Sequence, residues 1–322
     1  MTATSLDRPA ARTPGVRAGR GRGRKRIRTS GRATPYLFLL PYAVLFIGFI
    51  GIPAIYGIWI SLHDYDYLLP HQPWVGLKNY TALFESGSRD GADFWQSMRA
   101  TLVFTVASVP FLVVIPLLIA LLLNRRFPGR TFFRAVFFTP FVLGVAVVGV
   151  LFRFLLDPNI GVVNHYLHDV GVDRNIPWIT QLPWAWISLV SMTVWWTLGF
   201  NAIIYLAGLQ DISPELYDAA DIDGAGAWAK FRSVTLPGLR PVMLFVTTVT
   251  ILASANMFGQ ALLVTNGAPA NETKTAVFYI SQVGLRQYRQ GAAAAMSYIF
   301  AIILVIISLI NFRLFRGTQE KS

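Results

Sequence analysis

The chain has 322 residues, of which 54% are hydrophobic and 14% are charged, and its formal net charge is +12. Charged residues make up roughly a quarter of an ordinary soluble domain, so this composition excludes such a domain and indicates a membrane protein. The absence of cysteine excludes a disulfide framework, a thiolate metal site and a catalytic cysteine.

The first 34 residues contain the basic run VRAGRGRGRKRIR and show no apolar periodicity. This composition predicts a disordered basic tail in the cytoplasm. We favour a topogenic signal that keeps this end in the cytoplasm, and the alternative is an arm that binds RNA or anionic lipid. Since much of the positive charge lies in this run, the net charge does not indicate a nucleic-acid partner.

Apolar segments long enough to cross a bilayer, which takes about 20 helical residues, follow the tail. They cover Tyr36–Leu62, Met98–Leu123, Phe132–Leu156, Trp184–Leu206, Val242–Val264 and Ala293–Phe315. Prolines inside the second and third segments are compatible with membrane helices, because neighbouring groups satisfy the freed backbone. The sequence predicts an all-α polytopic membrane protein with about six transmembrane helices, whose transmembrane domain covers residues 35–322.

The placement of Lys and Arg predicts the orientation of the chain. If the N-terminus is cytoplasmic, the inner loops and tail carry Arg125, Arg126, Arg130, Lys230, Arg232, Arg240, Arg313, Arg316 and Lys321. The first two outer loops carry Lys78, Arg89 and Arg174. This bias predicts a multi-pass protein of the cytoplasmic membrane with both termini in the cytoplasm. The last outer loop, an exception, carries Lys274, Arg286 and Arg289, and we expect it to fold against a partner.

A polar segment at residues 211–240 separates the fourth and fifth apolar segments. The Ser-Pro-Glu sequence at 213–215 predicts a helix start with a capping hydroxyl, a proline at the first position and an acid at the positive end of the dipole. The Asp-Gly pair at 223–224 supplies the turn that ends this helix. We expect a second short helix from about Ala227, which the Leu-Pro pair at 236–237 stops.

The same segment contains a spaced motif. It begins with Asp218-Ala219-Ala220, reaches Gly224 after three residues and Val234 after nine more, and ends one residue later with Leu236-Pro237. This spacing resembles the EAA loop of inner-membrane permease subunits of binding-protein-dependent ABC importers. Asp218 stands where the family usually has glutamate, and Val234 where it usually has isoleucine.

Other parts of the chain resemble the carbohydrate-uptake branch of this family, which includes maltose and glycerol-phosphate permeases. The similar strings are PWVGLKNYTALF (residues 73–84), PNIGVVNHYL (residues 158–167) and LLVTNGAP (residues 262–269). The resemblance therefore covers nearly the whole chain after the tail. It implies the type I importer permease fold and transport of a sugar, glycerol phosphate or another polyol derivative.

The resemblance also implies a mechanism and partners. In this family the loop at 211–240, hereafter the coupling loop, docks into the cytoplasmic ATPase. The residues implied in that contact are Glu215, Asp218, Ala219, Ala220, Asp223, Gly224, Leu236 and Pro237. The partners are a second homologous permease, a dimer of ATP-binding subunits, an extracytoplasmic solute-binding protein and membrane lipid. We expect no cofactor and no enzymatic activity in this chain, since ATP hydrolysis belongs to the partner.

Neutral polar residues at helical spacing lie in the fourth and fifth apolar segments. The predicted substrate-path residues are Thr193, Thr197, Asn201, Thr250, Ser254 and Asn256. Hydroxyl and amide groups suit an uncharged, hydroxylated solute such as a sugar. The same groups can instead form packing contacts between membrane helices. In maltose-type importers the sugar is held by the spans that flank the coupling loop, so the resemblance supports a substrate path, in this chain or in its partner permease.

The apolar segments contain almost no Asp, Glu or His, which a proton relay would need, and we therefore expect an external energy source. The alternatives are a secondary transporter or channel for a small polar solute that works without an ATPase, and a structural or insertase-like protein. His165 and His168 have the spacing of a metal-binding pair, but only Asp157 and Asp169 lie near them, and we expect no metal.

Overall fold

The computed structural model describes residues 34–319, and these residues form helices and no β-sheet. One isolated bridge pairs His63 with Trp74. The helices, with π-helical turns marked η, are α1 (Thr34–Phe46), η1 (Ile47–Gly51), α2 (Ile52–Ser61), α3 (Lys78–Thr81), α4 (Arg89–Asn124), α5 (Arg130–Val142), α6 (Val145–Leu155), α7 (Val162–Asp169), α8 (Trp184–Asp211), α9 (Pro214–Ile222), α10 (Ala227–Lys230), η2 (Phe231–Thr235), α11 (Leu236–Gly238), α12 (Arg240–Ala255), η3 (Ala261–Thr265), α13 (Ala276–Ser281), η4 (Gln282–Arg286) and α14 (Gln290–Gln319). The predicted all-α class is confirmed.

Several helices of the described chain are long and apolar enough to cross a membrane. They cover Tyr36–Ser61, Arg89–Asn124, Trp184–Asp211 and Gln290–Arg313, and the two bent pairs α5–α6 and α10–α12 raise the number of spans from 4 to as many as 6. The predicted multi-pass protein with about six spans is confirmed. Three spans extend beyond the predicted bounds, because α4 begins at Arg89, α8 continues to Asp211 and α14 begins at Gln290.

The chain divides into two compact units at Pro53 and Ala54. In the first unit, α1 and η1 form one continuous apolar helix. The side chains of residues 36–51 are all exposed or half-buried. An apolar helix of this kind is typical of a membrane span that faces hydrocarbon. The predicted basic tail lies outside the described residues, apart from Thr34, which begins α1.

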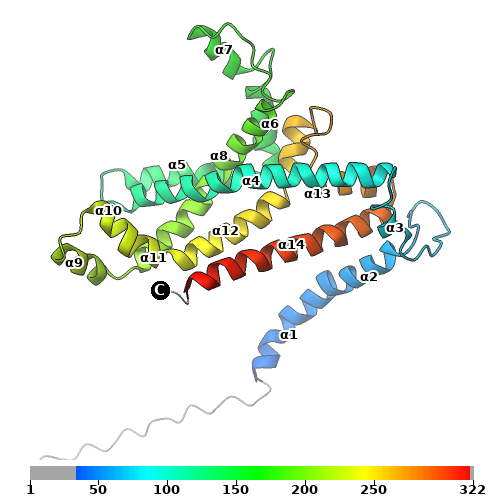
Figure 1. Cartoon of the computed structure of the whole chain (residues 1–322), viewed down its shortest axis with the longest axis horizontal. Helices are drawn as coiled ribbons and strands as arrows, with labels where there is room; N and C mark the ends of the chain where they lie inside the picture. The colour runs from blue at the N-terminus through cyan, green and yellow to red at the C-terminus, as the bar shows by residue number, and fades with distance from the viewer. Residues whose placement is uncertain (1–33, 320–322) are drawn as a thin grey trace, which may run out of the picture. The chain divides into compact units, whose positions relative to one another are not determined.

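The second unit is built around α4 and α8, which pack side by side (Figure 1). The Asn201 side chain of α8 donates to the Leu112 carbonyl of α4 at 3.0 Å. Further along, Leu117 of α4 shares a buried cluster with Tyr205 and Leu209 of α8. Residue numbers rise together on the two helices, so the helices run in the same direction. Their C-terminal ends therefore lie at the same side of the bundle.

The third predicted span, Phe132–Leu156, is not one continuous helix. The axes of α5 and α6 differ by 96°, and Leu143 and Gly144 between them have extended backbone. The Leu143 carbonyl, which the break frees, accepts a hydrogen bond from the indole of Trp196 at 2.9 Å. A contact with another span thus satisfies the exposed backbone group, as the bilayer requires.

The fifth predicted span, Val242–Val264, is also interrupted. Its helix α12 begins at Arg240 and ends at Ala255, after which residues 256–258 leave the helix before η3. The hydroxyl of Thr275 donates to the Met257 carbonyl at 2.5 Å and anchors this interruption. Hydropathy does not detect the break, because the interrupted stretch remains largely apolar.

The connection Thr265–Gln290, which we expected outside the membrane, contains α13 and η4, two helical segments that the sequence does not predict. Two nitrogens of Arg289 donate to the two carboxylate oxygens of Asp90 at 2.9 and 2.5 Å. The hydrogen bond with Asp90 raises the pKa of Arg289. Burial lowers the pKa of Lys274, while Asp93 acts in the opposite direction. Of the three basic residues in this connection, Arg289 therefore pairs with an acidic group within the chain.

Candidate functional site

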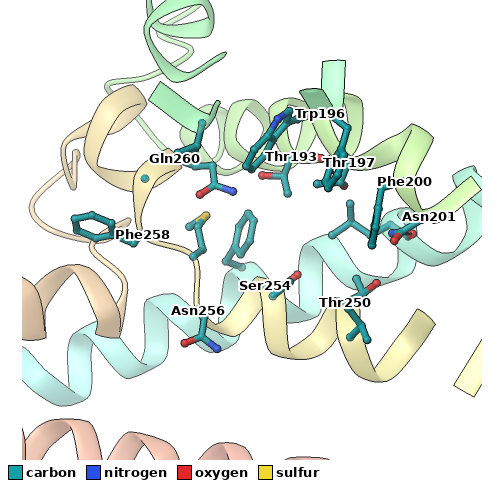
Figure 2. Close-up of a pocket in the computed structure, with 18 residues that line it drawn as sticks. Thr193, Trp196, Thr197, Phe200, Asn201, Thr250, Ser254, Asn256, Phe258 and Gln260 are labelled. Carbon is teal, nitrogen blue, oxygen red and sulfur yellow. Dashed lines mark hydrogen bonds between the residues drawn. The ribbon is translucent and has the colours of Figure 1, made fainter. Parts of the chain in front are cut away.

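A central cavity of about 330 Å³ lies among α4, the α5–α6 break, α8, α12 and the segment that follows α12. Figure 2 shows Thr193, Thr197 and Asn201 reaching it from α8. The residues that line it are Phe104, Leu112, Phe141, Val145, Thr193, Trp196, Thr197, Phe200, Asn201, Val249, Thr250, Ala253, Ser254, Asn256, Met257, Phe258, Gly259 and Gln260. The fold thus brings all the predicted substrate-path residues to one cavity.

Aromatic rings form one wall of the central cavity. The ring of Phe141 stacks on Phe200 with centroids 4.7 Å apart, and it lies 6.4 Å from the ring of Trp196. Because Trp196 also donates to the Leu143 carbonyl, its indole is fixed in place by the α5–α6 break. Aromatic faces of this kind offer flat apolar surface to a ring-shaped solute. The sequence reading did not single out the two phenylalanines, which lie among many others.

Several polar groups of the cavity already have partners. The hydroxyls of Thr193 and Thr197 donate to carbonyls one turn earlier in α8, each at 2.8 Å. Asn201 donates to Leu112 of α4 at 3.0 Å, and the Ser254 hydroxyl lies 3.2 Å from that of Ser108. Asn201 and Ser254 thus form packing contacts between membrane helices, which is the alternative to a role in the substrate path. The threonine oxygens keep acceptor capacity toward the cavity.

Two other polar side chains are available for a ligand. Within the described part of the chain, the Thr250 hydroxyl and the Gln260 amide have no hydrogen-bond partner, although both residues are buried. Both side chains line the cavity and their polar atoms are not sealed from it, so a solute in the cavity can hydrogen-bond to them. Gln260 lies just beyond the interruption after Ala255.

The lining of the central cavity is uncharged. The described residues that line it include no acidic side chain, no basic side chain and no histidine. A fixed charge in a cavity of low polarity attracts solutes of the opposite sign and excludes those of the same sign. This lining therefore fits a neutral solute that offers hydroxyl groups and flat apolar faces.

Two residues that are close in sequence to the cavity-lining residues do not line the central cavity. Trp195 lies on the opposite face of α8, in an apolar groove with Phe111 of α4. Thr247, one turn before Thr250, does not line the central cavity. The helical period explains the position of Trp195, since a step of one residue rotates a side chain by about 100°. Thr247 lies nearer the start of α12 than Val249, the first residue of that helix to line the cavity.

The coupling loop forms a compact helical unit of α9, α10, η2 and α11. Gly224 has a φ of +73° and makes the predicted turn after α9. Pro214 occupies the first turn of α9 as predicted, but Ser213 makes no side-chain capping bond. The Leu-Pro pair at 236–237 does not stop the second helix, which continues to Gly238. The π-helical turn η2 comes directly before Leu236 and Pro237, and its hydrogen bonds span five residues instead of four. This change in bonding accommodates Pro237, which has no backbone N–H to donate.

The coupling-loop residues differ in exposure. Glu215, Asp218, Ala219, Asp223 and Gly224 are exposed, and Leu236 and Pro237 are half-buried. Ala220 is only 8% exposed, so its small side chain packs within the loop.

Contacts inside the coupling loop hold its two helical halves together. The Tyr217 hydroxyl of α9 lies 3.0 Å from that of Thr235 in η2, and Lys230 forms an ion pair with Asp221. Ile222 and Trp228 are 88% and 72% exposed, which is unusual for large apolar residues in a polar loop. The sequence motif did not include either of these two side chains.

His165 and His168, which we expected to bind no metal, both lie in α7. His168 contacts the Asn175 amide oxygen through Nε2 at 2.8 Å. Among residues 34–319, no group of three or more His, Cys, Asp or Glu side chains could hold a metal ion.

Comparisons with known proteins agree on one family. Residues 94–319 match the family described as binding-protein-dependent transport system inner membrane component. A probable ABC transporter permease protein of Sinorhizobium fredii is 34% identical over 301 residues, covering 92% of this chain and 94% of the relative. The arabinooligosaccharides transport system permease protein of Bacillus subtilis is 32% identical, covering 88% of this chain and 89% of that protein.

A solved structure extends the similarity to the fold. A chain of the bacterial alginate ABC transporter, in complex with an alginate pentasaccharide-bound periplasmic protein, superposes with a TM-score of 0.75 and 26% identity. The match covers 88% of this chain and 94% of that one. The chain belongs to the family of inner-membrane components of binding-protein-dependent transport systems, the permease family that its coupling-loop motif resembles.

Proposed function

We propose that this chain is the permease subunit of an ABC importer that moves an uncharged saccharide through the central cavity. The observation that carries the proposal is the lining of that cavity, which combines free hydroxyl and amide groups with an aromatic wall. Relatives named for transport of arabinooligosaccharides and of starch degradation products support a saccharide. The solved relative carries alginate, which is acidic, and the uncharged lining here favours a neutral sugar instead.

The coupling loop is the part of the chain that contacts the ATP-binding subunit in this proposal. We infer that it docks on an ATP-binding subunit at the cytoplasmic face, with both termini of the chain on that side. The exposed side chains of Ile222 and Trp228 are the apolar anchors of this contact, and Glu215, Asp218 and Asp223 are polar groups around them. A second permease, a dimer of ATP-binding subunits and an extracytoplasmic solute-binding protein complete the importer.

Proteoliposomes test this assignment. Vesicles that contain the chain together with its co-purifying subunits and binding protein are expected to accumulate labelled neutral oligosaccharide only when ATP is supplied. Vesicles that contain the chain alone are expected to show no uptake. Equal uptake without ATP or partner subunits would support the secondary transporter or channel, which family membership does not favour.

The cavity residues are tested by removing hydrogen-bonding groups at nearly constant volume. Thr250→Val and Gln260→Leu are each expected to lower ATP-dependent uptake about tenfold, since each removes a hydrogen bond to solute. Initial uptake rates in the same proteoliposomes, normalised to the amount of permease, give the measurement.

Thr247→Val is the matched control, because Thr247 lies on the same helix but outside the cavity lining. Its uptake is expected to equal that of the unmodified chain. If Thr250→Val and Thr247→Val transport equally well, Thr250 does not belong to the solute path.

A further inference from the structure

A second cavity, of about 510 Å³, lies where α4 and α8 end beside the coupling loop, and hereafter it is called the boundary pocket. Its lining residues are Leu121, Asn124, Arg125, Leu209, Tyr217, Ala227, Trp228, Lys230, Phe231 and Thr235. Both helices are candidate membrane spans that run in the same direction, so their ends mark one boundary of the bilayer. The boundary pocket therefore lies at the level where lipid head groups meet protein.

The charges of the boundary pocket favour an anion. Arg125 and Lys230 reach it from different elements, and none of the described lining residues is acidic. Lys230 shares its charge with Asp221, which is outside the pocket. In the described part of the chain, the Arg125 guanidinium has no hydrogen-bond or ion-pair partner. Its charge is therefore available to a ligand.

Arg125 is also not needed to stabilise the end of α4. The guanidinium of Arg134 donates to the Leu123 carbonyl at 3.0 Å and supplies the positive charge that the C-terminal end of a helix favours. The Asn124 side-chain amide adds a neutral donor at the boundary pocket, whereas the hydroxyls of Tyr217 and Thr235 lie 3.0 Å apart and bond to each other. A tetrahedral phosphate can accept from the Asn124 amide as well as from the two cationic side chains.

The surroundings of the boundary pocket favour a phosphate that carries hydrocarbon chains. Leu121, Leu209 and Phe231 make part of the lining apolar. On the membrane side of Arg125, Leu122 and Leu118 lie about one and two helical turns away, and they are 53% and 57% exposed.

We propose that the boundary pocket binds the phosphate head group of an anionic phospholipid. Arg125 and Lys230 hold the phosphate, and the acyl chains follow the exposed leucines of α4. Basic pockets between transmembrane helices at the cytoplasmic side are suited to such head groups. The bound lipid joins the end of α4 to α9 and α10, and so links the bilayer to the coupling loop, whichever solute the central cavity carries.

Native mass spectrometry of the full-length chain, extracted with its co-purifying subunits and titrated with phosphatidylglycerol, tests this site. Arg125→Ala is expected to bind the first phosphatidylglycerol about fivefold more weakly, because it removes one cationic contact. Arg126→Ala, which removes the same charge from the next residue and lies outside the boundary pocket, is expected to leave this affinity unchanged. Arg125→Gln, which keeps a long polar side chain, replaces the alanine variant if that variant fails to fold.

Two results would overturn the assignment. Equal retention of phosphatidylglycerol by the Arg125 and Arg126 variants would show that the lipid binds elsewhere. Glycerol 3-phosphate, which has the phosphate but no acyl chains, is added as a competitor and is expected to displace little lipid. If it displaces phosphatidylglycerol as well as added phosphatidylglycerol does, the pocket binds a soluble phosphate and the lipid assignment is wrong.

Discussion

Replacing Gly199 by alanine is expected to remove most of the folded protein that detergent extracts from the membrane. Gly199 is buried where α8 crosses α5. A methyl group there would lie 2.3 Å from the Phe137 carbonyl oxygen and 2.5 Å from the Phe138 Cα. These neighbours are backbone atoms, which cannot rotate away as a side chain can. Overpacking of a buried contact costs about 3 kcal/mol at the upper end of its usual range, and this site belongs there.

The effect of Gly199→Ala would reach the central cavity as well, because Phe141 of α5 and Trp196 of α8 lie beside the crossing. Size-exclusion chromatography of a fluorescent fusion, with a melting temperature from the same sample, gives the measurement. Gly144→Ala is the control, since Gly144 has a φ of −65° and an added methyl group meets nothing within 4 Å. An unchanged melting temperature for Gly199→Ala would contradict the close approach of α5 and α8.

Replacing Gly224 by valine is expected to abolish coupled uptake while ATP hydrolysis by the proposed partner subunits continues. The φ of +73° at Gly224 is costly for any side chain, by about 1–2 kcal/mol, and more so for a β-branched one. An added Cβ meets nothing within 4 Å, so the cost is one of backbone conformation and not of packing. The turn between α9 and α10 would open, and the anchors Ile222 and Trp228 would lose their common arrangement.

Gly226→Val is the matched control for Gly224→Val. Gly226 lies two residues away in equally open space, and its φ of −67° suits any residue. We expect the Gly226 variant to keep both uptake and hydrolysis, measured as solute accumulated per ATP hydrolysed in proteoliposomes. Normal coupling in Gly224→Val, with both variants inserted at equal amounts, would remove the coupling loop from the mechanism.

Both predictions concern α8 and the coupling loop, which move together in the proposed mechanism. Leu239, between α11 and α12, is fully buried in a cluster with Tyr205 and Leu209 of α8. A methyl group at Gly208 of α8 would lie 2.6 Å from Val242 of α12, so the two helices approach closely beside the coupling loop. We infer that a push on the coupling loop moves α8 and α12 together. Since these helices carry most of the predicted substrate-path residues, the movement reshapes the central cavity.

The sequence alone correctly indicated the features that depend on local composition. Hydropathy over windows of about 20 residues located the spans, because burial in hydrocarbon acts on each helix separately. The turn at Gly224 followed from the freedom of glycine at positive φ. The threonines and asparagine of α8 followed from the helical period, and the fold brings them to the same cavity as the predicted polar residues of the fifth span.

Tertiary contacts decided the rest of the site. The α5–α6 break needs the Trp196 indole to satisfy the Leu143 carbonyl, and the interruption after Ala255 needs Thr275 to hold Met257. Those two departures from helix bring Phe141 and Gln260 to the cavity. The stability of each break depends on a hydrogen bond between segments distant in the sequence, and the spacing of residues within one segment carries no information about such partners.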